Sequence, residues 1–165
     1  MAEAEFDVFG YVRVPTQKMR KGRIVDRGAL NDFWQKAVEV ADQTGCYVFG
    51  MSSAGGLMPW YVGKATKGFQ QECFAPHKEN HYNCSLADYA RGQPVMFFIV
   101  AKSKACQKFI DDVETFLIQQ GVARNPRLRN DRKAQPPKWA IQGVIRGEVR
   151  RTPIRAQEFK RMMGL

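Results

Sequence analysis

Apolar and polar residues alternate with two different periods along this chain. Residues 95–101 are apolar throughout and have the length of one strand, which predicts a central strand buried on both faces. Residues 45–48 and 61–64 carry β-branched and aromatic side chains next to glycines, which predicts two strands joined by a loop over residues 51–60. Helices are predicted over residues 30–41, 67–74, 84–89, 105–119 and 156–163.

Glycine and proline mark the predicted ends of several elements. Gly121 is expected to end the helix over residues 105–119, and Gly164 the last helix. Pro76 is expected to separate the two helices that follow the second strand. The polar, basic segment at the N-terminus, residues 1–28, predicts a short strand or arm and then an exposed loop over residues 17–27.

The order of these elements predicts an α+β fold. We expect a small central antiparallel or mixed sheet of about three core strands, flanked by helices, with an added C-terminal strand over residues 138–145 and a helix. The chain has 165 residues, 44% of them hydrophobic, which suits one globular domain with a core.

The chain is strongly basic, with 26 Lys and Arg against 16 Asp and Glu and a formal net charge of +10. Twelve basic and three acidic residues lie between Arg124 and Arg161. Such a run is either a solvated surface or a surface that follows the phosphates of a polyanion, where each contact releases counterions. Charge alone does not distinguish nucleic acid from a membrane surface.

Targeting signals and cysteine usage give weaker expectations. No stretch approaches the ~20 apolar residues of a membrane-spanning helix, and the acidic N-terminus lacks the apolar run of a secretory signal. We therefore expect a soluble, cytoplasmic protein with no membrane partner. The 4 cysteines are scattered and are expected to be reduced thiols.

Two tyrosines on the predicted hairpin are the first candidates for chemistry. Tyr47 and Tyr61 would stand side by side, and a phenol can act as a general base or a hydrogen-bond donor when a neighbouring cation lowers its pKa. Lys64 is the nearest cation in the sequence. The alternative is that both rings pack in the core and only their hydroxyls meet water.

Glu114 is the next candidate, because a carboxylate within an apolar helical stripe costs free energy unless it is paired or binds a metal ion. One or two protein carboxylates are enough for Mg²⁺, which fills its other positions with water and phosphate oxygens. The adjacent Asp111 and Asp112 show that this helix also has a polar side, so an exposed position for Glu114 stays open.

The triplets Gly45-Cys46-Tyr47 and Tyr61-Val62-Gly63 resemble the signature of the GIY-YIG nuclease family. Residues 113–118 resemble the helix on which that family carries its metal-binding glutamate, which is Glu114 here. The resemblance spans roughly residues 44–130. It implies a nuclease-like core (44–130) with an N-terminal extension and helix before it (1–43) and a basic C-terminal extension packed on that core (131–165). It implies a metal-dependent endonuclease-like phosphodiesterase that acts on nucleic acid, with DNA as the expected partner and Mg²⁺ or Mn²⁺ as the cofactor.

The resemblance also implies roles for single residues. Tyr47, aided by Lys64, would position or deprotonate the attacking water, and Tyr61 would support the same centre. Glu114 would hold the divalent cation on the scissile phosphate. His77 lies where a family histidine could act as a general acid.

The resemblance also bears on an asparagine, on a missing arginine and on the contacts with nucleic acid. Asn130 resembles the asparagine that helps to hold the family's site together, better than Asn125 does, although an ordinary loop is the alternative. The family's phosphate-stabilising arginine falls at Gln71, a neutral amide, which places turnover in question. The side chains that we expect to contact nucleic acid are Lys67, Lys78, Arg127, Arg129, Asn130, Arg132 and Lys133.

Three other interpretations stay open. The chain could be a catalytically impaired nucleic-acid-binding or protein-interaction module on the same fold, or a basic structural protein of a ribosome or membrane surface. Two cysteines and both histidines fall within twelve residues and could bind structural zinc, although the spacing is not that of a standard finger. These four residues are Cys73, His77, His81 and Cys84.

Overall fold

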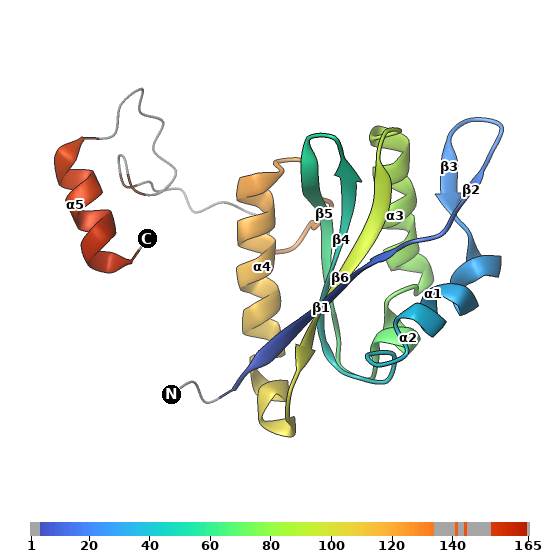
Figure 1. The fold of residues 1–165 in the computed structure, drawn as a ribbon, viewed down its shortest axis with the longest axis horizontal. Coiled ribbons are helices and arrows are strands. Elements are labelled where there is room, and N and C mark those ends of the chain that lie inside the picture. The colour runs from blue at the N-terminus through green and yellow to red at the C-terminus, as the bar shows by residue number, and fades with distance from the viewer. Residues whose placement is uncertain (1–3, 134–140, 142–143, 145–152, 165) are drawn as a thin grey trace. The chain divides into compact units, whose positions relative to one another are not determined.

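The computed structural model describes residues 4–133, 141, 144 and 153–164 (Figure 1). It contains two compact units, Met1–Ala134 and Gln135–Leu165, and each is described by itself below. The boundary predicted from the sequence lies four residues earlier, after residue 130.

A four-stranded antiparallel sheet forms the centre of the first unit, in the order β1-β6-β4-β5. The predicted α+β class is therefore confirmed. The apolar strand β6, Gln93–Ala101, lies inside the sheet between two neighbours, as its composition predicted. The sheet has one strand more than the expected three, because β1, Phe6–Arg13, pairs along the outer side of β6.

The hairpin of β4, Gly45–Ser53, and β5, Gly56–Ala65, is longer than predicted. Ser53 is directly opposite Gly56, so only Ala54 and Gly55 form the turn. The prediction of a loop over residues 51–60 is therefore wrong. Gly56 has a φ of +100°, a conformation that glycine adopts without strain, and this permits a tight turn where the sequence indicated a loop.

The helices differ from their predicted bounds for local reasons. Helix α1 is Leu30–Lys36. In the turns at 37–42 that follow it, Ala37 and Ala41 continue the apolar pattern and are buried, whereas Val38 is 69% exposed. Helix α2 is Phe69–Glu72. The predicted break at Pro76 lies between α2 and α3, but α3, Pro76–Asp88, begins at the proline itself and not at residue 84, because proline is favoured in the first turn of a helix.

Helix α4, Ile110–Arg124, follows the 3₁₀ segment Lys104–Phe109. The prediction that Gly121 ends this helix is wrong. A Cβ atom at Gly121 would lie 3.0 Å from Leu128 Cδ2, so this glycine lets the following segment return closely against the helix.

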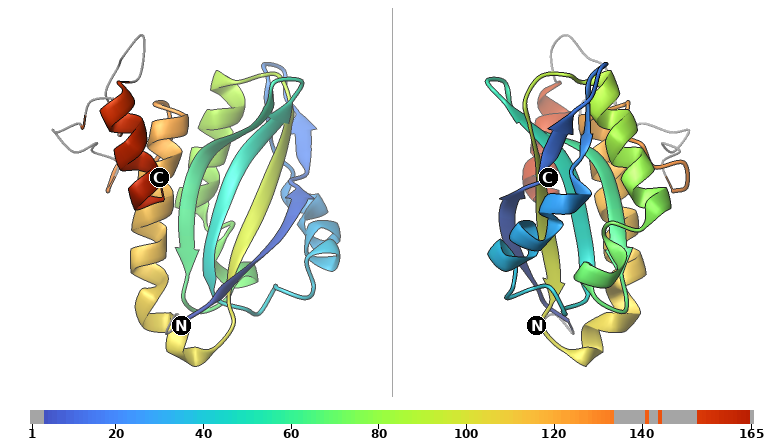
Figure 2. Two further views of the ribbon diagram at one scale, coloured as in Figure 1. Left: turned by 60° about the vertical axis from the view of Figure 1, so that its left-hand side comes forward. Right: turned by 90° about the vertical axis from the view of Figure 1, so that its right-hand side faces the viewer.

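The helices form layers on the two faces of the sheet (Figures 1 and 2). Helices α1, α2 and α3 lie on one face, and the main core there includes Phe33, Phe69 and Phe98. Helix α4 lies on the other face, where a smaller buried cluster joins Val62 of β5 to Ile118 of α4. β5 is thus an edge strand between two helical layers.

A second, two-stranded sheet replaces the exposed loop predicted over residues 17–27. It is a hairpin of β2, Thr16–Lys18, and β3, Arg23–Val25. Val25 is buried, and its backbone N–H donates to Asn83 Oδ1 on α3 at 2.9 Å. This contact fixes the base of the hairpin on α3.

The second unit contains helix α5, Ile154–Met163. It ends at Gly164, whose φ of +70° makes the left-handed cap that the sequence predicted. The strand predicted over residues 138–145 lies almost wholly outside the described residues.

Candidate active site at the edge of the sheet

A cleft of about 450 Å³ lies at the outer edge of β5, between α3, α4 and the segment that follows α4. We call it the β5-edge cleft. Lysine and arginine side chains line it together with carboxylates, two imidazoles and one phenol. The lining residues are Tyr61, Lys64, His77, His81, Asp111, Glu114, Ile118, Arg129, Asn130, Asp131, Arg132 and Lys133.

The segment after α4 is held against the free edge of β5 by hydrogen bonds. Asn125 Nδ2 donates to the Pro59 carbonyl oxygen at 2.7 Å, and the Arg129 N–H donates to the Trp60 carbonyl oxygen at 2.8 Å. Asn130 accepts from the Val62 N–H at 2.9 Å and donates to the Val62 carbonyl oxygen at 2.8 Å. Asn130 thus acts as a one-residue extension of the sheet and places residues 131–133 beside the cleft.

Two carboxylates and two ammonium groups form an ionic cluster in the cleft. Lys133 Nζ lies 2.9 Å from Glu114 Oε2 and 3.0 Å from Asp111 Oδ1. Lys64 Nζ donates to Asp111 and lies 3.7 Å from Glu114 Oε2. The four groups come from β5, α4 and the following segment, so the cluster joins the elements that frame the cleft.

The cluster perturbs the pKa values of its members. The hydrogen bonds from Lys64 and Lys133 lower the pKa of Asp111 to about 2. The hydrogen bond to Asp111 raises the pKa of Lys64. Burial alone would lower the pKa of Lys133, but its hydrogen bonds to Glu114 and Asp111 outweigh burial and the pKa lies above its usual value. All three groups are therefore charged at neutral pH.

Lys133 reaches the cluster from a backbone with a φ of +61°. This left-handed conformation costs a non-glycine residue about 1–2 kcal/mol. The ion pairs with Asp111 and Glu114 and the anchoring of Asn130 keep the residue there.

Glu114 and Asp111 are suited to a divalent cation. They stand one turn apart on α4, and an oxygen of each lies about 3 Å from the same ammonium nitrogen. Glu114 is the more protected, with 14% of its side chain exposed. Within the described part of the chain, no three His, Cys, Asp or Glu side chains converge, but Mg²⁺ needs only one or two carboxylates. An ion bound there would have to replace Lys133 at both carboxylates and Lys64 at Asp111.

Tyr61 lies at the opposite wall of the cleft, stacked on His81. The two ring centroids are 4.8 Å apart with an interplanar angle of 16°. Burial, followed by the charge of Glu114, raises the pKa of Tyr61 to about 12. The phenol therefore stays protonated at neutral pH, and a protonated phenol can donate a hydrogen bond.

Tyr47 lies outside the cleft. Its side chain is fully buried and its ring packs at right angles to Phe69. Tyr47 on β4 pairs with Gly63 on β5, and paired residues lie on the same face of the sheet. Lys64 follows Gly63 along β5, so its side chain points to the opposite face from that of Tyr47. Burial, and then repulsion from Tyr82, raises the pKa of Tyr47 well above its usual value. The prediction that Lys64 lowers this pKa is wrong.

The glycine of the second triplet makes room for Tyr47. A Cβ atom at Gly63 would lie 2.3 Å from the Tyr47 hydroxyl oxygen. The Lys78 ammonium lies 5.3 Å from the centre of the Tyr47 ring and donates to the Lys64 carbonyl oxygen at 3.1 Å. Burial lowers the pKa of Lys78. These contacts hold the ends of β4, β5 and α3 together.

The cleft gathers eight of the twelve residues that the sequence singled out for chemistry or nucleic-acid contact. They are Tyr61, Lys64, His77, Glu114, Arg129, Asn130, Arg132 and Lys133. Arg129 also pairs with Asp88, the last residue of α3.

The other four predicted residues are not among the lining residues. Tyr47 and Lys78 lie behind the cleft, and the backbone N–H of Lys67 donates to Glu72 Oε2 at 2.8 Å. Arg127 stacks over Trp60, with its guanidinium carbon 5.4 Å from the ring centre. Gln71 is exposed on α2 and does not line the cleft either.

Asp111 and His81 are the cleft residues whose roles the sequence prediction missed. Asp111 stands three residues before Glu114, and His81 four residues after His77. Both intervals place two side chains on one face of a helix. The spacing could have predicted each pair, but it identifies a site only when the two helix faces are known to line the same cleft.

The alternative of structural zinc at Cys73, His77, His81 and Cys84 gains no support from the arrangement of these side chains. All four residues are described, and they are not among any metal-binding group in the described part of the chain. Cys73 is fully buried beneath α3, and Tyr82 donates to its carbonyl oxygen at 2.6 Å. The two imidazoles instead face the cleft.

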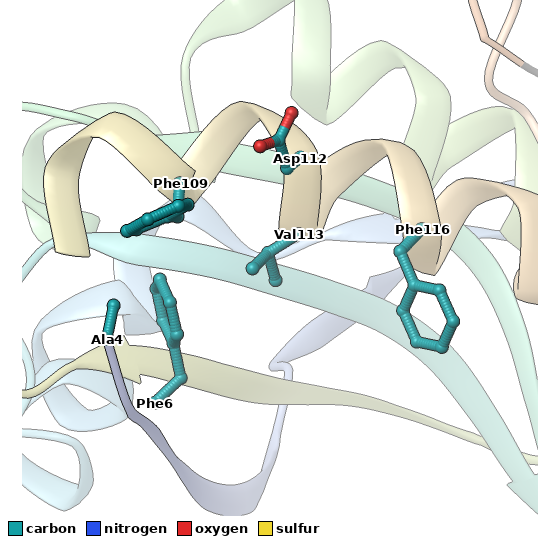
Figure 3. A pocket seen from close by; sticks show the side chains of 6 residues that line it. All are labelled: Ala4, Phe6, Phe109, Asp112, Val113 and Phe116. Atoms are coloured by element: carbon teal, nitrogen blue, oxygen red, sulfur yellow. The ribbon is translucent and has the colours of Figure 1, made fainter. Parts of the chain in front are cut away.

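A different pocket lies between the start of β1 and α4 (Figure 3). Its walls are apolar apart from one carboxylate, so it lacks the donors and acceptors of a catalytic centre. The lining residues are Ala4, Phe6, Phe109, Asp112, Val113 and Phe116.

No helix in the described part of the chain combines the length and apolar character needed to cross a membrane. Comparison of the chain with protein-family models, with curated proteins and with solved structures gives no match.

Proposed function

We propose that the β5-edge cleft binds a phosphodiester of nucleic acid, with DNA the expected form, and cleaves it with the help of a divalent cation. The observation that carries the proposal is the meeting of Glu114 and Asp111 with Lys64 and Lys133 in one cleft. Carboxylates suit a divalent cation, and the ammonium groups suit the anion that this cation would share. The likeness of the two tyrosine triplets to those of GIY-YIG nucleases supports the same chemistry.

The cationic side chains would bind the phosphate. Lys64, Arg132 and Lys133 present their charges to the cleft from β5 and from the segment after α4. Phosphate oxygens in the cleft would attract Lys64 and Lys133 away from Glu114 and Asp111, the two residues that would hold Mg²⁺ or Mn²⁺. Such an ion would supply Lewis-acid stabilisation of the charge on phosphorus.

Tyr61 and the imidazoles supply protons to the same centre. The protonated Tyr61 phenol donates a hydrogen bond to a phosphate oxygen or to the attacking water. His77 and His81 face the cleft from successive turns of α3, where an imidazole can protonate a leaving oxygen. Tyr47 supports β5 from the core and does not reach the substrate.

Other arginines take the role of the phosphate-stabilising arginine that the family carries at the position of Gln71. The residue at the family position, Gln71, is on α2 and exposed. Arg129 and Arg132 instead enter the cleft from the opposite side, on the segment that Asn130 anchors to β5. A guanidinium group can contact two phosphate oxygens from either direction.

Single-turnover cleavage of labelled DNA and RNA oligonucleotides tests the proposal. Glu114→Gln removes the best-protected carboxylate and is expected to lower the metal-dependent rate by at least ~10²-fold. Glu39→Gln, at an exposed position outside the cleft, is the matched control and should cleave as the wild type does. Equal rates for Glu114→Gln and the wild type would refute the role of Glu114.

A second candidate is a binding module without turnover on the same cleft. It is favoured by one observation, that Lys64 and Lys133 already neutralise both carboxylates. In that case oligonucleotides bind in a salt-dependent manner, and no cleavage occurs with Mg²⁺ or Mn²⁺.

A further inference from the structure

The β2–β3 hairpin concentrates positive charge away from the β5-edge cleft. No acidic residue lies between Asp7 and Asp26, whereas five basic residues do. Four of them are on the hairpin. Lys18 is the last residue of β2, Arg23 is the first residue of β3, and Arg20 and Lys21 lie in the turn between them. The Met19 N–H closes this turn by donating to the Gly22 carbonyl oxygen at 2.9 Å.

The pairing within this hairpin places like charges against each other. Lys18 is directly opposite Arg23 in the antiparallel register, so their side chains emerge on the same face. Like charges in such a pair destabilise a hairpin. An anion between them would convert this repulsion into two attractive contacts.

Two nitrogens of the Arg23 guanidinium also lack an acceptor. Its Nε and Nη2 atoms are buried and have no hydrogen-bond partner within the described part of the chain. Burial lowers its pKa, and no carboxylate contributes to the shift. Glu79, on the neighbouring helix α3, is paired with Arg27 at 3.2 Å. Two buried N–H donors without an acceptor cost free energy that a bound anion would recover, and Arg23 as a whole is only partly buried.

The position of the hairpin connects it with the cleft. Helix α3 contacts β3 on one side and β5 on the other, and Asn83 of α3 holds Val25 of the hairpin. A helix with its side chains is about 10–12 Å wide. Successive nucleotides advance about 3.4 Å along a duplex, so three or four of them span α3.

We propose that the β2–β3 hairpin is a second phosphate-binding site, in which Lys18 and Arg23 bind the backbone of a nucleic acid that also enters the β5-edge cleft. The inference takes its partner from the proposed function. Cationic side chains at paired positions of a two-stranded ribbon suit a phosphate backbone or groove. A membrane surface is the less fitting polyanion, because Met19 is the one apolar side chain at the tip.

The test is the salt dependence of binding. Fluorescence anisotropy of the full chain with a labelled duplex is measured from 0.05 to 0.5 M salt, for the wild type and for Lys18→Gln/Arg23→Gln. Two lost phosphate contacts should reduce the slope of log K against log salt by about 1.8 and weaken binding ~60-fold at 0.1 M salt. The matched control is Lys36→Gln/Lys104→Gln, which removes the same charge at two exposed positions and should change neither quantity.

Thermal unfolding without nucleic acid separates binding from structure. Removal of the Lys18–Arg23 repulsion should leave the melting temperature equal or higher, whereas a loss would show that Arg23 has a structural role and would overturn the inference. An unchanged salt slope would overturn it too. So would a wild type that binds anionic phosphatidylglycerol vesicles through Lys18 and Arg23 but no duplex. If the hairpin variant loses duplex affinity and the wild type never cleaves, the inference stands and the catalytic proposal fails.

Discussion

Replacement of Asn130 by alanine tests the anchoring of the cleft most simply. The change removes two hydrogen bonds, one from the Val62 N–H and one to the Val62 carbonyl oxygen. Each bond is expected to contribute about 1 kcal/mol net, so Asn130→Ala should destabilise the protein by about 2 kcal/mol. For a chain of this length, that corresponds to a fall in Tm of roughly 4–8 °C.

Urea unfolding followed by circular dichroism measures this loss. Asn31→Ala, at an exposed position on α1, is the matched control and should change the free energy of unfolding by less than about 0.5 kcal/mol. The Asn130 variant should also lose nucleic-acid affinity, because residues 131–133 are no longer held at the cleft. A variant as stable as the wild type would show that these two hydrogen bonds do not anchor the segment.

Three further predictions concern single side chains. Gly63→Ala forces a Cβ atom against the Tyr47 ring and should cost about 1–3 kcal/mol in urea unfolding; an unaffected stability would contradict the packing. The pKa of Asp111 is about 2 in the folded protein, so this carboxylate should stabilise the fold above pH ~4 and lose that contribution as the pH falls through about 2. A carboxyl NMR titration checks this, and the midpoint of Asp111 should move to higher pH in Lys133→Met. Tyr61 should titrate near pH 12 by absorbance at the phenolate band, and a midpoint near 10 would show that it is exposed.

The sheet could be predicted because its signals are local. The apolar composition of β6 and the aromatic residues of β4 and β5 identify strands without knowledge of their partners. β1 and the β2–β3 hairpin were harder to predict, because their strands gain stability from pairing with β6 and from packing on α3, not from an apolar pattern of their own.

The site could be predicted in part. Tyr61, Lys64 and Glu114 were identified from residue type and motif, but the direction of Tyr47 depends on register. The register is set by the two-residue turn at 54–55 and by the irregularity between Phe49 and Gly50. A longer loop in the prediction left both unknown, and with them the face on which each side chain lies.

The ionic cluster could not be predicted from the sequence. Lys133 meets Glu114 only because Asn130 fixes the segment on β5 and because Lys133 adopts a positive φ. Neither property follows from the residue types. The basic run that begins at Arg124 indicated a polyanion partner, but it did not indicate which cations would enter the cleft.

The most direct test of catalysis at the β5-edge cleft is the nicking of supercoiled plasmid DNA by the full chain as Mn²⁺ or Mg²⁺ is titrated. We predict metal-dependent nicking by the wild type, saturation with metal, and loss of nicking in Glu114→Gln. Absence of nicking at every metal concentration, with salt-dependent DNA binding intact, would contradict a catalytic role for the β5-edge cleft. The protein would then be a nucleic-acid-binding module.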